Sequence, residues 1–232
     1  MAKDVIIALD FPSREEVFSF LEPFEPPVFV KVGMELFYRE GGSIVKELKE
    51  RGYKVFLDLK LHDIPNTVKS AMANLLDYNP DMVDVHIAGG SHMIEEVSNL
   101  INKQEKKPIL LGITMLTSTS EERMHKELKI DKSLSLEDTV LSYVEMGLEA
   151  GLTGIVCSPL EVPKLKEVFP NLVTVTPGIR MEIVEGDDQE RVVTPKRARE
   201  LGSDYIVVGR PITKAKNPVE AYEKIKKEFL EG

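Results

Sequence analysis

The sequence predicts a (β/α)8 barrel, an α/β fold of the TIM-barrel type in which residues 1–232 form a single domain. Eight short runs of apolar, β-branched residues alternate with longer amphipathic segments along the chain. The runs are apolar throughout, as expected for parallel strands that are covered on both faces. The length of 232 residues also fits one barrel, since such barrels have about 250 residues.

A doubly wound parallel sheet is the alternative fold of this class. Such a sheet normally has fewer strands, and its dinucleotide-binding form carries a GxGxxG turn after the first strand. No such turn follows the first apolar run of this chain. Eight strand–helix units therefore favour the barrel.

The expected elements alternate in order along the chain. The first strand covers residues 5–9, and Ser13, with Glu16 three residues later, is typical of a capped helix start after it. The other strands are expected at 28–32, 55–59, 82–86, 109–113, 154–157, 172–176 and 205–208. The other helices are expected at about 35–51, which ends at Gly52, and at 65–77, 91–102, 136–150, 162–169, 195–201 and 218–230.

Two connections are longer than a barrel requires. Residues 117–135 are polar and have room for a small helix, and residues 179–194 are rich in charge. Both follow the C-terminal end of a strand, on the face where barrel active sites lie. Because it carries Arg180 and Gln189, we interpret 179–194 as a candidate lid; the alternative is a solvated loop without a catalytic role.

Composition excludes several classes of partner. The chain has 30 Lys and Arg against 39 Asp and Glu, and the net charge of -9 disfavours nucleic acid and anionic membranes. Its single cysteine allows no intrachain disulfide. The first ten residues lack the basic region and long apolar stretch of a signal peptide, and no segment approaches the ~20 apolar residues of a membrane span. We expect a cytoplasmic enzyme or binding protein, without a zinc or calcium motif.

Charged residues gather at the ends of the first three expected strands. They are Asp10, Lys31, Asp58, Lys60 and, just past the third strand, Asp63. In a barrel core such side chains are costly unless they are paired or face a ligand. Asp58 and Lys60 are two residues apart, so along a strand they point the same way. The pattern predicts one shared network, with a purely structural salt-bridge cluster as the alternative.

A second polar group follows the last two strands. Residues 177–180, Pro-Gly-Ile-Arg, come after the seventh strand, and Gly209 and Arg210 come after the eighth. Barrels commonly build a phosphate site at this place. Glycine lets backbone N–H groups approach the anion, and arginine offers two parallel hydrogen bonds. We therefore expect these residues to bind phosphate.

Residues 58–67 read DLKLHDIPNT and closely resemble the D-x-K-x-x-D-I-P-N-T signature of the orotidine 5′-monophosphate decarboxylase family. The resemblance covers nearly the whole chain and includes ALD at 8–10, KVG at 31–33, VHIAGG at 85–90, LTS at 116–118, TPGIR at 176–180 and VVGRPI at 207–212. It implies a carboxy-lyase without metal or other cofactor. The implied reaction converts orotidine 5′-monophosphate to uridine 5′-monophosphate, the last step of de novo UMP synthesis.

The resemblance also implies the catalytic roles. Lys60 is then the proton donor to C6 of the pyrimidine ring, and Asp58 flanks it and keeps it charged. Asp63 and Thr67 match positions that the family contributes to the partner's site across a homodimer interface. The charged network then alternates Lys31, Asp58, Lys60 and Asp63 of the partner subunit.

The remaining candidate residues are implied to bind the nucleotide. Asp10 and Lys31 match positions that hold the ribose hydroxyls, and Thr117 matches one that recognises the pyrimidine edge. The phosphate ligands implied by the resemblance are Arg180, Gln189, Gly209 and Arg210.

Two other functions are weighed against this one. Sugar-phosphate decarboxylases and hexulose-phosphate synthases share the D-x-K-x-x-D core but use magnesium, and they lack the I-P-N-T continuation and the LTS segment. A non-catalytic barrel that binds nucleotide phosphates has no need of a buried chain of charges. His62 and His86 are interpreted as packing or orienting residues, and Cys157 as a small buried apolar residue.

Overall fold

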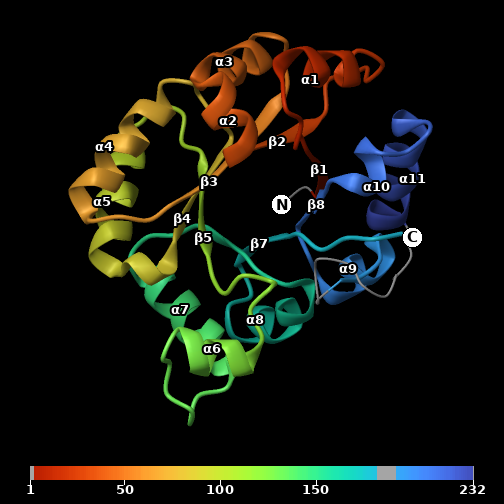
Figure 1. Cartoon of the computed structure of the whole chain (residues 1–232). Coiled ribbons are helices and arrows are strands. Elements are labelled where there is room, and N and C mark those ends of the chain that lie inside the picture. The colour runs from red at the N-terminus through yellow and green to blue at the C-terminus, as the bar shows by residue number, and fades with distance from the viewer. Residues whose placement is uncertain (1–2, 182–191, 232) are drawn as a thin grey trace.

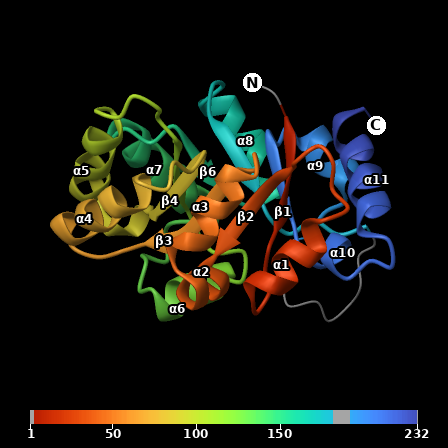
Figure 2. The ribbon, with the colours of Figure 1, turned by 90° about the horizontal axis from the view of Figure 1, so that it is seen from above.

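The eight strands form a closed parallel barrel in the order β1-β2-β3-β4-β5-β6-β7-β8. The computed structural model describes residues 3–181 and 192–231. Figure 1 looks along the barrel, with the strands around the centre and the helices outside them. In Figure 2, turned by 90°, the helices flank the strands. The (β/α)8 fold predicted from the sequence is confirmed.

The observed strands lie within two residues of the predicted ones at either end. They are β1 (Asp4–Ala8), β2 (Phe29–Gly33), β3 (Lys54–Leu61), β4 (Met82–His86), β5 (Ile109–Ile113), β6 (Gly154–Val156), β7 (Val173–Thr176) and β8 (Tyr205–Val208).

The helices of the described residues surround these strands. They are α1 (Arg14–Leu21), α2 (Met34–Glu40), α3 (Gly42–Glu50), α4 (Pro65–Leu76), α5 (Ser91–Ile101), α6 (Glu121–Glu127), α7 (Leu136–Glu149), α8 (Val162–Val168), α9 (Pro195–Leu201), α10 (Arg210–Thr213) and α11 (Pro218–Leu230). Short 3-10 turns, Ile87–Gly89 and Pro159–Glu161, precede α5 and α8. Within the described ranges, no helix is both long and apolar enough to cross a bilayer.

The structure corrects the prediction at two places. The helix predicted over 35–51 is in fact two helices, because Gly41 takes a left-handed φ of 66° at the end of α2. The four-residue helix α10 directly after β8 was not predicted. Both differences arise from single turns that a search for long amphipathic segments passes over.

Two finer predictions about helices are confirmed. The side chain of Ser13 accepts a hydrogen bond from the backbone N–H of Glu16 at 3.3 Å, which caps α1. The polar connection over 117–135 carries a small helix, α6.

The interior of the barrel is filled by side chains that alternate along the strands. One buried cluster with its packed neighbours takes a residue from each strand: Ile6, Phe29, Phe56, Met82, Leu111, Val156, Val175 and Tyr205. The residues between them, such as Val5 and Ile7, belong to a larger cluster that joins strands to helices. Side chains of a strand point alternately to its two faces, so the barrel has an inner and an outer core.

Two aspartates clamp neighbouring strands at the N-terminal end of the barrel. Asp81, just before β4, accepts a hydrogen bond from the backbone N–H of Val55 in β3 at 2.8 Å. Asp204, just before β8, does the same for Thr174 in β7 at 2.9 Å. The carboxylate of Asp81 also pairs with Lys49 of α3, and the carboxylate of Asp204 pairs with Lys166 of α8.

Replacing Leu111 by Ala tests the inner core. Leu111 is fully buried, with 0% exposed, and the cavity left behind is expected to lower the free energy of unfolding by about 2–5 kcal/mol in urea denaturation. Leu128→Ala is the matched control because Leu128 is 54% exposed; its effect is expected to stay within about 0.5 kcal/mol. Equal effects of the two substitutions would contradict the assignment of the inner core.

Candidate active site

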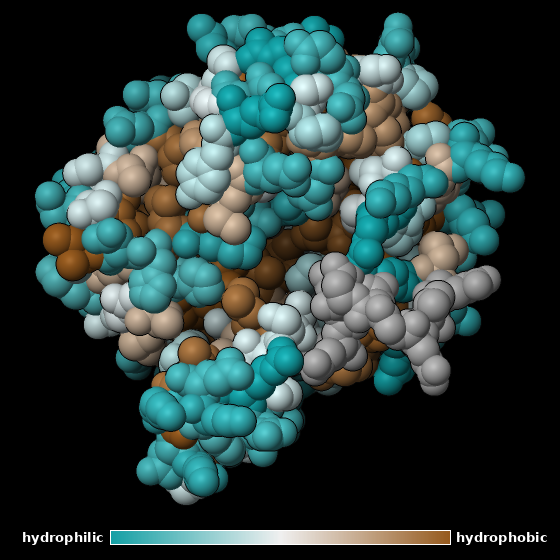
Figure 3. Space-filling view, viewed as in Figure 1, coloured by the Kyte–Doolittle hydropathy of each residue, from teal (hydrophilic) through white to brown (hydrophobic). Residues whose placement is uncertain are grey.

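A cavity of about 320 Å³ lies beyond the inner cluster, at the C-terminal ends of the strands. Its wall continues the inward-facing series of strand residues; on β3, for example, Phe56 is followed by Asp58 and Lys60. The view in Figure 3 shows apolar surface recessed near the centre of the molecule, inside a hydrophilic rim. The volume suits a small-molecule ligand, since such sites commonly enclose about 300–1,000 Å³.

Four of the charged residues predicted at strand ends form a continuous chain on the cavity wall. The amine of Lys31 lies 3.2 Å from Asp10 Oδ1 and 3.3 Å from Asp58 Oδ2. The amine of Lys60 contacts the other oxygen, Asp58 Oδ1. Positive and negative groups therefore alternate, and Asp58 is shared by two lysines.

Within this network of four residues, Asp58 and Lys31 stay charged despite burial because each has oppositely charged neighbours. Burial disfavours the charged form of Asp58, but Lys31, a hydrogen bond with Asp84 and Lys60 together lower its pKa to about 2. Burial also disfavours charge on Lys31, whereas Asp58 and Asp10 raise its pKa above the ordinary value. Asp58 and Lys31 are therefore both charged at neutral pH.

A further buried acid of the site was missed by the sequence analysis. Asp84 of β4 is 1% exposed, and its Oδ1 accepts hydrogen bonds from the backbone N–H groups of Leu59 at 3.0 Å and Lys60 at 2.7 Å. It lies inside the apolar run at 82–86, which was interpreted only as a buried strand. An acid within such a run is rare unless it has a partner, and that is the signal available in the sequence.

The strand that carries Lys60 is irregular at this point. Leu57 of β3 pairs with Val83 of β4 and Leu61 pairs with Val85, so four steps along β3 match two along β4. Lys60 itself has a left-handed φ of 52°, which is uncommon for a residue other than glycine. The contact predicted between Lys60 and the acid two residues before it exists, but the strand that makes it is bulged rather than regular.

The residues predicted to bind phosphate line the same cavity, after β7 and β8. They are Arg180, Gly209 and Arg210, and they are joined by Gly178. Gly178 has a φ of 79°, which glycine adopts without steric cost. The backbone N–H of Arg180 donates to the carbonyl of Val193 at 2.9 Å, so the two ends of the predicted lid are tied together at its base.

Of the remaining predicted residues, one lines the cavity, two lie outside it and one is not described. Thr117 is half-buried and lines the cavity. Asp63 and Thr67 are exposed and do not line it, and Asp63 Oδ1 accepts a hydrogen bond from the backbone N–H of Ile64 at 2.6 Å. Gln189, with residues 182–191 of the predicted lid, lies outside the described residues.

The sequence analysis assigned no catalytic role to His62, His86 or Cys157. The rings of His62 and His86 lie 5.5 Å apart, and burial, followed by His62 and Lys60, lowers the pKa of His86. Cys157 is buried in the apolar part of the cavity wall. Within residues 3–181 and 192–231, no group of three or more His, Cys, Asp or Glu side chains could hold a metal ion.

Acid unfolding tests the low pKa of Asp58. Its folded-state pKa of about 2 lies below the ordinary 3.8, so the unfolded chain takes up this proton first and stability is lost as the pH falls from about 4 to about 2. In urea denaturation at a series of pH values, Asp58→Asn is expected to lose less stability over this interval than the unsubstituted protein, by on the order of 1–2 kcal/mol. Identical losses would rule out the lowered pKa.

Comparison with known proteins identifies relatives of the whole chain. Residues 3–225 match the family described as "Orotidine 5'-phosphate decarboxylase / HUMPS family". Orotidine 5′-phosphate decarboxylases from Bacillus cytotoxicus and Bacillus mycoides are each 57% identical to the chain, over 99% of it and 98% of their own length.

Two solved structures share the fold over nearly their whole length. Orotidine 5′-phosphate decarboxylase from Lactobacillus acidophilus has 43% identity and a TM-score of 0.86, covering 98% of this chain and 99% of its own. An uncharacterized conserved protein from Geobacillus kaustophilus has 45% identity and a TM-score of 0.85, covering 97% and 99%. The match over residues 3–225 and the 57% identity to relatives of the same length show that the chain belongs to the orotidine 5′-phosphate decarboxylase / HUMPS family.

Proposed function

We propose that this chain is an orotidine 5′-phosphate decarboxylase, which converts orotidine 5′-monophosphate to uridine 5′-monophosphate in the last step of de novo UMP synthesis. The observation that carries the proposal is the Lys60 amine, held by Asp58 in a cavity that also contains Arg180 and Arg210. The names of relatives that are 57% identical support it. A cytoplasmic location follows from such a role.

The cavity offers a partner for each part of this nucleotide. Arg180 and Arg210, with the backbone of Gly178 and Gly209, suit the phosphate, and Gln189 joins them by family resemblance. Asp10 and Lys31 suit the ribose hydroxyls. Thr117 suits the polar edge of the pyrimidine, while the apolar residues of the wall exclude water from the ring: Ile113, Met115, Val156 and Val207.

The reaction then needs a cation and a proton at one place. The bond between C6 and the carboxylate carbon breaks, carbon dioxide leaves, and the electron pair stays on C6. An ammonium group beside C6 stabilises this developing charge more strongly in a dry cavity than in water. Lys60 transfers a proton to C6 and is left as a neutral amine, which takes up a proton from solvent. Asp58 fixes the ammonium position through its contact with Lys60.

We also propose a homodimer in which each site is completed by the partner's Asp63 and Thr67. Both residues are exposed in their own chain. Ile64, next to Asp63, is 67% exposed although it is large and apolar. The side chains of this segment are therefore accessible to a second copy of the chain.

The magnesium-dependent alternative is considered because the family description also includes the HUMPS group, the hexulose-phosphate synthases. The I-P-N-T continuation at 64–67 and the LTS segment at 116–118 favour the decarboxylase. A non-catalytic binder is disfavoured by the buried charge chain, which costs stability and serves no purpose in simple binding.

The purified protein is expected to decarboxylate orotidine 5′-monophosphate in a spectrophotometric assay of substrate absorbance. The rate is expected to be unchanged by a chelator such as EDTA, because the proposed chemistry uses only Lys60 and its neighbours. Loss of activity on chelation would favour the magnesium-dependent alternative, and absence of turnover would favour a binder.

Lys60→Ala supplies the control within this assay. Loss of a positioned proton donor is expected to lower kcat by at least about 100-fold. Uridine 5′-monophosphate is still expected to raise the melting temperature of the variant, because the phosphate ligands are intact. A Lys60→Ala protein with full turnover would refute the proposed mechanism.

Mixing two inactive variants tests the shared site. Hybrid dimers of Lys60→Ala and Asp63→Ala chains are expected to regain activity, since one of their two sites then has both Lys60 and the partner's Asp63. The measurement is kcat of the mixture after subunit exchange, compared with each variant alone. Heterodimers that are demonstrated by mass spectrometry and remain inactive would exclude sharing of Asp63.

A further inference from the structure

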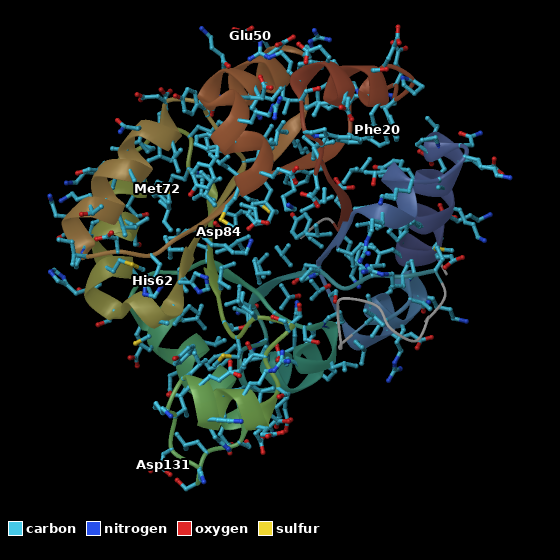
Figure 4. The ribbon with its side chains drawn as sticks, in the orientation of Figure 1. Phe20, Glu50, His62, Met72, Asp84 and Asp131 are labelled. Atoms are coloured by element: carbon cyan, nitrogen blue, oxygen red, sulfur yellow. The ribbon has the colours of Figure 1, made fainter. Side chains whose placement is uncertain are left out.

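Asp84 is a buried acid that the proposed mechanism does not yet use. Figure 4 shows it among the strands near the middle of the barrel, whereas Asp131 lies at the tip of a peripheral loop. In the alternation along β4, Asp84 follows Met82 of the inner cluster and therefore faces the barrel interior. Asp84 does not line the substrate cavity, but its neighbour Asp58 does.

The contacts of Asp84 converge on the bulge that carries Lys60. Its Oδ1 accepts both consecutive N–H groups at the bulge, from Leu59 at 3.0 Å and Lys60 at 2.7 Å. The register shift takes these groups out of the regular ladder between β3 and β4. A left-handed lysine persists only where its surroundings enforce it. The carboxyl of Asp84 is the side chain that contacts both amides here.

The second oxygen of Asp84 links the bulge to the charge chain. Among the described residues, no N–H or O–H group donates to Oδ2, and the carboxyl group beside Asp84 is that of Asp58. Burial first, and then the negative charge of Asp58, raise the pKa of Asp84 well above its ordinary value. A proton on Asp84 lets Oδ2 donate to Asp58, which resolves the repulsion and leaves no oxygen without a partner.

We propose that Asp84 is a positioning residue for the reaction, which holds the Lys60 backbone in the bulge through one oxygen and Asp58 through the other. The proposal rests on the proposed function, because it assigns Asp84 the task of aiming the Lys60 amine at the reacting carbon. Asp84 touches neither the substrate cavity nor the amine itself. Its effect passes through the two residues that do.

This arrangement predicts different effects of two substitutions of similar shape. The proposed role does not require a charge: in Asp84→Asn the side-chain oxygen still accepts both N–H groups, and the amide still donates to Asp58. In Asp84→Leu the branched shape is kept, but both backbone groups and Asp58 lose their partner. The asparagine variant is expected to keep most of the kcat, whereas the leucine variant is expected to lose about 100-fold, as for a misplaced catalytic group.

Asp81→Leu is the matched control. Asp81 also accepts a hydrogen bond from a β3 backbone N–H, that of Val55, but at the opposite end of the barrel. This substitution is expected to lower the melting temperature and to leave kcat unchanged. It separates loss of a strand clamp in general from loss of the clamp at Lys60.

The experiment compares the unsubstituted protein with Asp84→Asn, Asp84→Leu and Asp81→Leu. For each, kcat and KM are measured together with the affinity for uridine 5′-monophosphate, and crystal structures report the bulge. In Asp84→Leu we expect kcat to fall while nucleotide affinity changes little, with the Lys60 backbone displaced. In Asp84→Asn we expect the bulge to be preserved.

The outcomes separate the inference from the proposed function. If the unsubstituted protein does not decarboxylate its substrate, the proposed function fails, and the bulge geometry in the variants still decides whether Asp84 holds Lys60. If the protein is active and Asp84→Leu keeps full kcat, the inference fails alone. It fails equally if Asp84→Asn is as slow as Asp84→Leu, or if Asp84→Leu is folded and its bulge is unchanged.

Discussion

The sharing of Asp58 between two lysines is the interaction on which the open end of the barrel depends. Lys31 and Lys60 each contact a different oxygen of this carboxylate. Together with Asp10 they make a set of two positive and two negative groups, whose formal charges cancel. Lys31 and Asp58 are the largely buried members of this set, and losing one of them is costly, about 3–5 kcal/mol, because the other charge is left uncompensated.

The barrel tolerates this cluster because its inward-facing residues change from apolar to charged along the strands. The layer at Phe56 is apolar and packed, the next inward residue of β3 is Asp58, and the last is Lys60 at the cavity. Above this layer, Asp58 and Lys60 thus stand where the packed interior gives way to a space that a ligand can fill. The apolar layer beneath them prevents water from reaching the ion pairs from below, which strengthens the pairs.

The fold and most of the site are readable from the sequence because they follow periodic rules. Uninterrupted apolar runs predict parallel strands, and charges at the ends of those runs predict the contacts of Lys31 with Asp10 and Asp58. The break between α2 and α3 was missed because the amphipathic pattern continues through Gly41, although the Gly-Gly pair there was a usable signal.

The bulge at Lys60 was beyond such rules. Alternation along a strand assumes a regular ladder. Nothing in residues 55–61 indicates that β3 uses two more residues than β4 between two successive pairings. The cause lies in another strand, where Asp84 offers an acceptor to two N–H groups at once. Long-range pairing of this kind depends on which side chain the fold brings opposite, and a single sequence does not contain that information locally.

The clamps at the N-terminal rim have a different consequence. Asp81 joins β3 to β4 and Asp204 joins β7 to β8, each with a lysine from the helix before. Two strands lie between these pairs on each side of the ring of eight, so the pairs stand on opposite sides of the barrel. These two clamps are therefore related by an approximate twofold axis along the barrel, whereas the charged residues of the opposite rim lie at the ends of β2 and β3 and just after β1, β7 and β8. The same clamp can occur twice at the N-terminal rim because its task there is structural. The cavity rim has no such repeat, because an asymmetric ligand needs a different partner on each side.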